Sequence, residues 1–303
     1  MKKALVQIHV AVLLWGFTGV LGRAISLDAP VLVWYRMLLT AIFIAVIIFY
    51  RRQWVPIARR DIAQLALIGC LMGLHWVAFY GAIKFANTSI ALVCLSTASI
   101  FTSLLDPMVN KGKYDVKELL LGLLALTGVY FIYRFQQMFG IGIAFGVTAA
   151  ILSSVFTVLN KRIASKYPTR PMVFYEMSAG WLFLTLLMPL QLVYNPHTVL
   201  LPQGMDWLWL VILSLCCTVW AQSLALSALK YISSFTATLS VNLEPVYGIL
   251  LAFLFFKENK ELHGGFFIGM GLICLSVLLQ MLRLLKPKGA SPGYIREKGA
   301  IGD

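Results

Sequence analysis

Long apolar runs recur from one end of the 303-residue chain to the other, and they constrain its fold more than any other feature. Many hold about 17 to 23 residues, enough for a helix to cross a hydrocarbon core of about 30 Å. Hydrophobic residues make up 60% of the chain and charged residues only 12%, whereas soluble domains are about one quarter charged. The sequence therefore predicts an all-α integral membrane protein in contact with the lipid bilayer.

Charged residues, prolines and glycines divide the apolar runs into ten expected transmembrane helices. The expected ranges are 8–26, 30–50, 62–82, 88–109, 118–133, 139–159, 171–191, 206–227, 233–256 and 263–282. The first run follows only Lys2 and Lys3 and ends without a small-residue cleavage site. We therefore expect a retained first helix rather than a removed signal peptide.

Lys and Arg are distributed unevenly between the two expected sides of the membrane. With the N-terminus inside, the inner segments hold 19 of these residues and the outer segments hold 5. Because cytoplasmic segments carry the excess of basic residues, we expect both termini to be cytoplasmic. The net charge of +13 lies in short groups at helix ends, so it does not indicate a nucleic-acid partner. Residues 287–303 are expected to form a disordered cytoplasmic tail.

Neither the cysteines nor any nucleotide-binding motif indicates a cofactor. All five cysteines lie within apolar runs and form no CxxC pair, so they predict buried thiols without a disulfide or a metal site. No P-loop sequence occurs, so we expect that a gradient rather than a bound nucleotide supplies any energy.

A weak internal repeat runs through the chain. The segment "GAIKFANTSIALVCL" (81–95) aligns with "SALKYISSFTATLSV" (227–241) at an offset of 146, and "VLVWYRM" (31–37) aligns with "PMVFYEM" (171–177) at an offset of 140. The two copies are expected at 1–136 and 137–286, with five helices each. An odd number of crossings would invert the second copy, and inverted repeats are the plan of many secondary transporters.

Arg36 and Glu176 occupy equivalent positions in these copies. Inversion would put them in opposite leaflets, so we expect no close ion pair between them. Arg36 is expected either to anchor a substrate carboxylate or to be structural, because a charge inside a membrane is costly unless it has a partner. Glu176 is expected to be structural, since it lies near the basic loop that contains Lys166 and Arg170.

Several of these features together resemble a known family. They are the two five-helix copies, "WG" at Trp15 and Gly16, Arg36 early in the second helix, "NLEPVYGILLAFLFFKE" (242–258) and "GMGLICLSV" (269–277). The chain resembles the EamA-type transporters of the drug/metabolite transporter superfamily. The first copy departs from the pattern, because Ser99 stands where the second copy has Pro245. The resemblance implies transport of small metabolites, often amino acids, across a bacterial inner membrane without ATP, through a central cavity.

Glu244 is the leading candidate for substrate binding, because a carboxylate in the middle of a membrane helix needs a polar partner or a polar cavity. Thr236, Ser240, Glu244 and Tyr247 recur at helical spacing and predict one polar face, with Asn242 as a further candidate. Glu244 can alternatively be structural, bonded to a neighbouring helix, and a proton-binding role is a third interpretation.

An aromatic stripe and a polar stripe predict facing walls of a cavity. Trp76 and Tyr80 share one helix face, and Gln222 lies at the offset of 146 from Trp76, on a face with Ser214 and Thr218. Such walls suit a partly apolar metabolite, although simple helix packing explains the aromatic residues as well.

Four further candidates keep two interpretations each. Trp15 lies near the middle of its helix and can face the cavity or pack against lipid or helices. His75 can carry protons or act as a neutral hydrogen-bonding residue. Ser96 and Ser99 can contact substrate or allow close helix packing.

The expected function is secondary transport of small metabolites, such as amino acids or similar amphipathic compounds, by alternating access and in the direction of efflux. A lipid-head-group flippase is the alternative. An intramembrane enzyme is disfavoured because the four histidines are scattered and no HExxH or GxSxG motif occurs. A channel is disfavoured because no loop resembles a selectivity filter. The sequence leaves the substrate, the coupling ion and the oligomeric state open.

Overall fold

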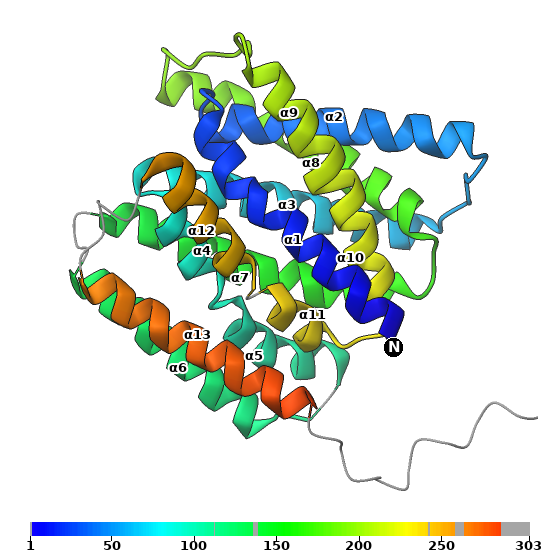
Figure 1. The fold of residues 1–303 in the computed structure, drawn as a ribbon. Coiled ribbons are helices and arrows are strands. Elements are labelled where there is room, and N and C mark those ends of the chain that lie inside the picture. The colour runs from blue at the N-terminus through cyan, green and yellow to red at the C-terminus, as the bar shows by residue number, and fades with distance from the viewer. Residues whose placement is uncertain (1, 112, 136–138, 242, 258–263, 286–303) are drawn as a thin grey trace, which may run out of the picture.

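The computed structural model describes residues 2–111, 113–135, 139–241, 243–257 and 264–285. Every regular element in these ranges is a helix (Figure 1). The elements are α1 (Lys2–Ala24), α2 (Ala29–Tyr50), α3 (Arg59–Phe85), α4 (Thr88–Leu95), α5 (Ala98–Asn110), α6 (Val116–Phe135), α7 (Gly140–Ala164), α8 (Thr169–Tyr194), α9 (Asp206–Ser214), the π-helical segment η2 (Leu215–Trp220), α10 (Ala221–Leu229), α11 (Ser234–Val241), α12 (Glu244–Phe256) and α13 (Gly264–Leu285).

Seven helical stretches in the described ranges are long and apolar enough to cross a membrane, and α12 and α13 add shorter apolar stretches. The seven are Lys3–Ala24, Ala29–Tyr50, Arg59–Phe85, Thr88–Asn110, Gly140–Ala164, Thr169–Tyr194 and Asp206–Leu229. The protein is therefore a multi-pass membrane protein, as the apolar runs predict.

Two expected helices are interrupted, so the expectation of uninterrupted helices over 88–109 and 233–256 is wrong. The first is divided into α4 and α5, and the second is divided into α11 and α12. The helix expected at 206–227 is continuous but contains the π-helical segment η2. At the first break the hydroxyls of Ser96 and Thr97 donate to the carbonyls of Val93 and Cys94, three residues back. Local bonds of this kind compete with the helical ladder.

Pro245 lies at the second break, between α11 and α12, and its position in the helix differs from the expected one. It lies in the first turn of α12, not inside a continuous helix. Proline is tolerated there because the first amides of a helix have no intrahelical acceptor. Pro245 thus begins a helix, and Glu244 is the first residue of that helix.

The two breaks match in the two copies of the sequence repeat. Adding the offset of 146 to the bounds of α4 and α5 gives the bounds of α11 and α12. Both pairs end on a lysine in the left-handed conformation, Lys111 with φ 54° and Lys257 with φ 55°. The repeated sequence therefore corresponds to a repeated backbone geometry.

The helices form one bundle with a paired edge. Figure 1 shows α6 and α13 side by side along one edge, and the Ser276 hydroxyl of α13 donates to the Leu121 carbonyl of α6 over 2.7 Å. In the centre, α3 packs against α7 and α8.

The contact between α3 and α8 is unusually close. A Cβ atom at Gly69 would lie 2.0 Å from the carbonyl oxygen of Glu176, and one at Gly180 would lie 2.5 Å from the Gly69 carbonyl oxygen. Glycine is therefore required at Gly69 for the two backbones to touch.

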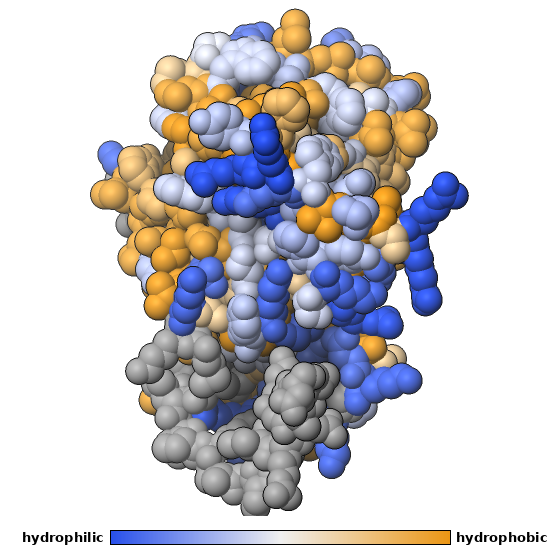
Figure 2. All heavy atoms as spheres, turned by 90° about the vertical axis from the view of Figure 1, so that its right-hand side faces the viewer, coloured by the Kyte–Doolittle hydropathy of each residue, from blue (hydrophilic) through white to orange (hydrophobic). Residues whose placement is uncertain are grey.

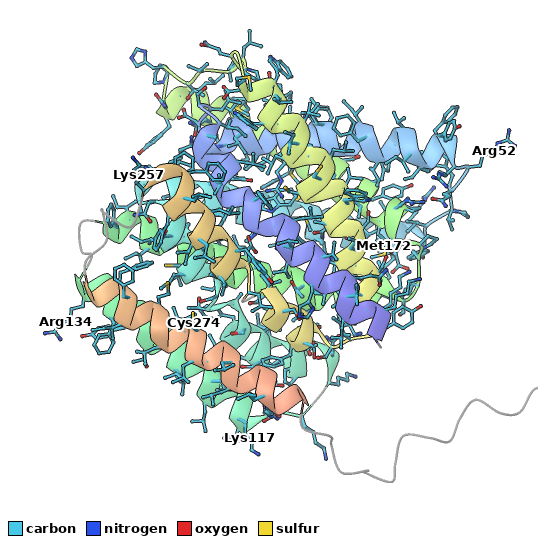
Figure 3. All side chains as sticks on the ribbon, viewed as in Figure 1. Arg52, Lys117, Arg134, Met172, Lys257 and Cys274 are labelled. Carbon is cyan, nitrogen blue, oxygen red and sulfur yellow. The ribbon has the colours of Figure 1, made fainter. Side chains whose placement is uncertain are left out.

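Charged side chains gather at the ends of the bundle. Figure 2 faces the end that holds the N-terminus of α1 and the α2–α3 connection, where hydrophilic side chains are flanked by apolar ones. Figure 3 shows Arg52 at this end and Arg134 and Lys257 at the opposite one. Near Arg52, Asp61 binds Lys166 over 3.1 Å and accepts from the Tyr167 hydroxyl over 2.8 Å. These contacts tie the start of α3 to the α7–α8 connection.

Candidate functional site

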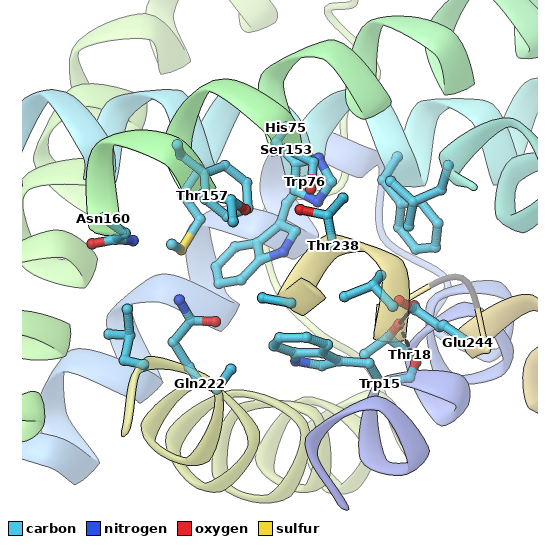
Figure 4. Close-up of a pocket in the computed structure, with 18 of the residues that line it drawn as sticks. Trp15, Thr18, His75, Trp76, Ser153, Thr157, Asn160, Gln222, Thr238 and Glu244 are labelled. Atoms are coloured by element: carbon cyan, nitrogen blue, oxygen red, sulfur yellow. Dashed lines mark hydrogen bonds between the residues drawn. The ribbon is translucent and has the colours of Figure 1, made fainter. Parts of the chain in front are cut away.

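A cavity of about 90 Å³ lies in the middle of the bundle, between α1, α3, α7, α10, α11 and the start of α12 (Figure 4). A buried water needs about 10–15 Å³ measured in this way, so the space can hold several waters or a small polar ligand. Its lining includes the polar residues Thr18, Arg36, His75, Ser153, Thr157, Asn160, Gln222, Thr238 and Glu244, and the aromatic residues Trp15, Trp76, Phe79 and Phe156.

Arg36 is held on the wall of this cavity by neutral groups. Its Nε donates to the Thr218 hydroxyl over 2.9 Å, and its Nη1 donates to the Tyr80 hydroxyl over 2.8 Å. Its guanidinium lies 3.7 Å from the centre of the Trp76 ring, a cation–π contact. Nη2 has no hydrogen-bond partner among the described residues. Arg36 is therefore fixed in place with donor capacity left for a ligand.

The π-helical segment η2 contributes to this arrangement. Thr218 lies in η2 and donates to the Leu213 carbonyl, five residues back, while it accepts from Arg36. Single π turns interrupt α-helices most often at functional positions. The sequence predicted Thr218 on the polar face opposite Trp76, and Arg36 is the group that joins the two.

Glu244 reaches the cavity from the N-terminus of α12 and is only 4% exposed. The Thr18 hydroxyl lies 3.4 Å from its Oε1 but donates at closer range to the Trp15 carbonyl, over 2.6 Å, and Oε2 accepts no hydrogen bond among the described residues. Figure 4 shows this pair at one end of the cavity. The free amides at a helix N-terminus favour a nearby negative charge. Glu244 is thus an available acceptor in a cavity that also holds an available donor, Arg36.

Trp15, Trp76 and Gln222 form the middle of the cavity. Figure 4 shows the two indoles on opposite sides of the space, with the Gln222 side chain extending toward it. Gln222 makes no hydrogen bond within the described part of the chain, although it is only 6% exposed. An unbonded amide between aromatic walls is typical of an orienting group in a ligand pocket.

The face of α7 that lines the cavity was not predicted from the sequence. Ser153, Thr157 and Asn160 line the cavity at spacings of four and three residues (Figure 4). These three polar residues share one face of an apolar helix, so helical periodicity predicts them as it predicts the shared face of Trp76 and Tyr80. Thr18 was also missed because it is a single hydroxyl in an apolar run, and Thr238 because it lies two residues from Thr236 and Ser240, off the face that they share.

The remaining predicted site residues lie outside the cavity lining. Tyr80 acts through Arg36, which it holds. The Ser240 hydroxyl donates to the Thr236 carbonyl, Ser96 donates within its own turn, and Ser99 donates to the Ser96 carbonyl. Tyr247 packs with its Cβ 2.8 Å from the position of a Cβ at Gly16. Asn242 lies outside the described residues.

The predicted polar face from Thr236 to Tyr247 is wrong, since the break before Glu244 removes the continuous helix on which it depended. Only Glu244 of the residues on that face reaches the cavity lining.

His75 lines the cavity with one nitrogen already bonded. Its Nδ1 lies 2.8 Å from the Ala149 carbonyl, which can only accept, so Nδ1 carries a proton. The ring stacks on Phe79 and meets Phe156 edge to face. These contacts favour the interpretation of a neutral hydrogen-bonding residue. Within the described ranges, no three His, Cys, Asp or Glu side chains are grouped closely enough to hold a metal ion.

Arg36 bonds to Thr218 and Tyr80, and no ion pair between it and Glu176 occurs among the described residues. The reason given for Glu176 is wrong, however. Lys166 binds Asp61 and Arg170 binds Gln53, so the basic loop does not neutralise Glu176. Glu176 is completely buried.

The structure is thus a multi-pass membrane protein with an internal cavity that offers a cation, a carboxylate and an amide to a small molecule. The sequence model of the EamA-like transporter family matches residues 2–134 and again residues 140–282. The chain belongs to this family, a branch of the drug/metabolite transporters. The family points to a transporter rather than an enzyme.

Two relatives agree with this assignment, and one solved structure shares the fold. An uncharacterized transporter of Archaeoglobus fulgidus is 24% identical over 269 residues, covering 88% of this chain and 93% of the relative. The uncharacterized transporter YxxF of Bacillus subtilis is 21% identical over 291 residues, covering 92% and 90%. One crystal structure shares the fold with a TM-score of 0.69 at 18% identity, over 94% of this chain and 99% of that one.

Proposed function

We propose that the chain is a secondary transporter of small amphipathic metabolites, with amino acids as the leading substrate class and efflux as the direction. The observation that carries this proposal is the pairing of Arg36 and Glu244 in one cavity. Arg36 has a free Nη2 and Glu244 has a free Oε2. A carboxylate and an ammonium group on one small molecule match these two, since both interactions are charge-assisted hydrogen bonds.

The walls support the amphipathic part of the proposal. The indoles of Trp15 and Trp76 suit an apolar or cationic substrate group, and Gln222 offers a neutral polar contact. A volume of about 90 Å³ suits a small metabolite better than a lipid with long acyl chains.

We further propose that two inverted five-helix repeats, 1–136 and 137–286, rock against each other around this cavity. The matched breaks and the matched left-handed lysines, both at the offset of 146, support the repeat. Glu244 at a broken helix, beside the proposed midplane, agrees with the way discontinuous helices form binding sites in secondary transporters.

The proposed location is a bacterial inner membrane with both termini in the cytoplasm. The support is the distribution of Lys and Arg, 19 on the proposed inner side against 5 outside. Residues 287–303 would then be a cytoplasmic tail.

The test is transport by the purified protein in liposomes, using a panel of labelled amino acids and small metabolites. We expect saturable movement of at least one amphipathic compound, and Glu244→Gln should reduce it strongly. Asp106→Asn is the matched control, because Asp106 bonds to Asn110 away from the cavity. Flux of the wild-type size in Glu244→Gln would overturn the site, and movement of long-chain lipid instead of metabolites would favour a flippase.

A further inference from the structure

Glu176 is a carboxylate that the proposed transport site does not use. It lies in α8, is 0% exposed, and neither of its oxygens has a hydrogen-bond partner. The Asn160 side chain on α7, the preceding helix in the chain, interacts with Glu176. The Oδ1 of Asn160 is also buried without a partner. Three buried acceptor oxygens therefore lie in one place.

No positive charge is available to Glu176 in the described part of the chain. Its polar neighbour among the described side chains is the Asn160 amide, which carries no charge. On the neighbouring elements, Arg36 of α2 is bonded to Tyr80 and Thr218, and His75 of α3 is bonded to Ala149. Lys161 of α7 is bonded to the Leu229 and Ile232 carbonyls.

Three further titratable groups lie along the same helices. Lys230, next to α10, donates to the Tyr167 carbonyl, and Asp61 at the start of α3 is bonded to Lys166 and Tyr167. The Cys70 thiol, beside Gly69, has no electrostatic interaction with Glu176. None of these groups offsets the charge of an ionised Glu176.

One proton resolves this arrangement. A protonated Glu176 can donate to the Oδ1 of Asn160, since the two ends of an amide are interchangeable by rotation. That single bond satisfies one carboxyl oxygen and the orphan amide oxygen together. An ionised carboxylate without water or a cation is strongly disfavoured inside a bundle.

We propose that Glu176 and Asn160 form a proton-binding site between α8 and α7 that couples transport to protons. Protons reach it from the cavity, because Asn160 lines the cavity at the end of the Ser153 and Thr157 face (Figure 4). Since the Glu176 side chain is completely buried, the cavity beside Asn160 is also the path by which the proton leaves.

The first test measures protonation without any transport. The infrared absorption spectrum of the detergent-purified Glu244→Gln protein should contain the carbonyl band of a buried protonated carboxyl group at neutral pH. The band should disappear in the Glu244→Gln, Glu176→Gln double variant and remain in the Glu244→Gln, Asp106→Asn control. Absence of the band from the Glu244→Gln protein, or its persistence in the double variant, overturns the site.

A second measurement guards against a Glu176→Gln protein that does not fold. The melting temperature of the wild type is recorded from about pH 5 to about pH 9, a range that covers the titration of buried glutamates. Stability that depends on bound protons is lost as pH rises, so the wild-type melting temperature should fall. Glu176→Gln should lack this part of the fall, and equal slopes in both proteins contradict the proposal. If Glu176→Gln does not fold, a wild-type melting temperature that does not fall with pH contradicts it instead.

The coupling itself rests on the proposed function and is tested separately in liposomes. An imposed pH gradient should change wild-type flux about tenfold and Glu176→Gln flux less than twofold. If sodium replaces the proton gradient in driving flux, coupling by protons is wrong. If the infrared band is present but no metabolite moves under any gradient, the proposed function fails while the proton site stands.

Discussion

The two helix breaks lie between helices with equivalent bounds, but the residues around them differ in chemistry. At the break between α4 and α5, the hydroxyls of Ser96, Thr97 and Ser99 donate to carbonyls of their own turn. At the break between α11 and α12, Glu244 starts the second helix and reaches the cavity. The first copy has Ala98 at the position equivalent to Glu244. The break is therefore an architectural feature of both halves, while its use as a site belongs to one of them.

Arg36 and Glu176 repeat this contrast at a second pair of equivalent positions. Arg36 has two hydrogen bonds and an aromatic ring against its guanidinium. Glu176 has no hydrogen bond to either oxygen. A guanidinium is always charged and needs permanent partners, whereas a carboxyl group can become neutral. Arg36 therefore has a fixed charge, whereas the proposed proton site would give Glu176 a charge that depends on proton binding.

The largest effect should come from removing the charge at the second break. Glu244→Gln keeps the size of the side chain but loses the charge-assisted bond to a substrate ammonium, worth about 1.5–3 kcal/mol. We expect flux in liposomes to fall at least about tenfold, since 1.4 kcal/mol is a factor of about ten. Asp106→Asn in the other half should stay within about twofold of the wild type. Equal losses in both variants would remove the contrast between the breaks.

Arg36→Lys should have the next largest effect, because lysine cannot reproduce the fork of donors or the flat contact with Trp76. Losing one well-formed bond costs about 1 kcal/mol, so the KM for an anionic or zwitterionic substrate should rise about fivefold. Arg170→Lys is the matched control, since Arg170 bonds to the exposed Gln53. An unchanged KM in Arg36→Lys would assign Arg36 to structure alone.

Much of this could be predicted from the sequence, for identifiable reasons. The length of the apolar runs predicts the helices. Polar residues within these runs predict Arg36, Glu244 and Gln222 as cavity residues, and an aromatic stripe predicts Trp76. Helical periodicity also predicted Ser240 and Tyr247 as site residues. That prediction assumed one continuous helix, whereas a new helix starts at Glu244 and Pro245. The partners of Arg36 come from two separate elements, α3 and η2, and no spacing within one segment encodes such contacts.

The close approach of α3 and α8 gives a third prediction, on stability. Gly69→Ala puts a methyl group 2.0 Å from a backbone oxygen of Glu176, so the helices must separate. Overpacking costs about 1–3 kcal/mol, and the melting temperature in detergent should fall. Gly271→Ala on α13 is the control, because a Cβ there meets nothing within 4 Å. It should leave the melting temperature unchanged or raise it slightly, since alanine favours helices over glycine.

The smallest effect should come from the hydroxyl beside Glu244. Thr18→Val preserves shape but removes a hydroxyl 3.4 Å from Oε1, a contact worth about 0.5–1 kcal/mol when the hydroxyl turns its proton from the Trp15 carbonyl to Glu244. Flux should fall about threefold. Ser96→Ala at the first break removes a hydroxyl that bonds only to the Val93 carbonyl, so its flux should equal that of the wild type. If Ser96→Ala reduced flux as much as Thr18→Val, the first break would contribute to the transport path, and the chemical contrast between the two breaks would be false.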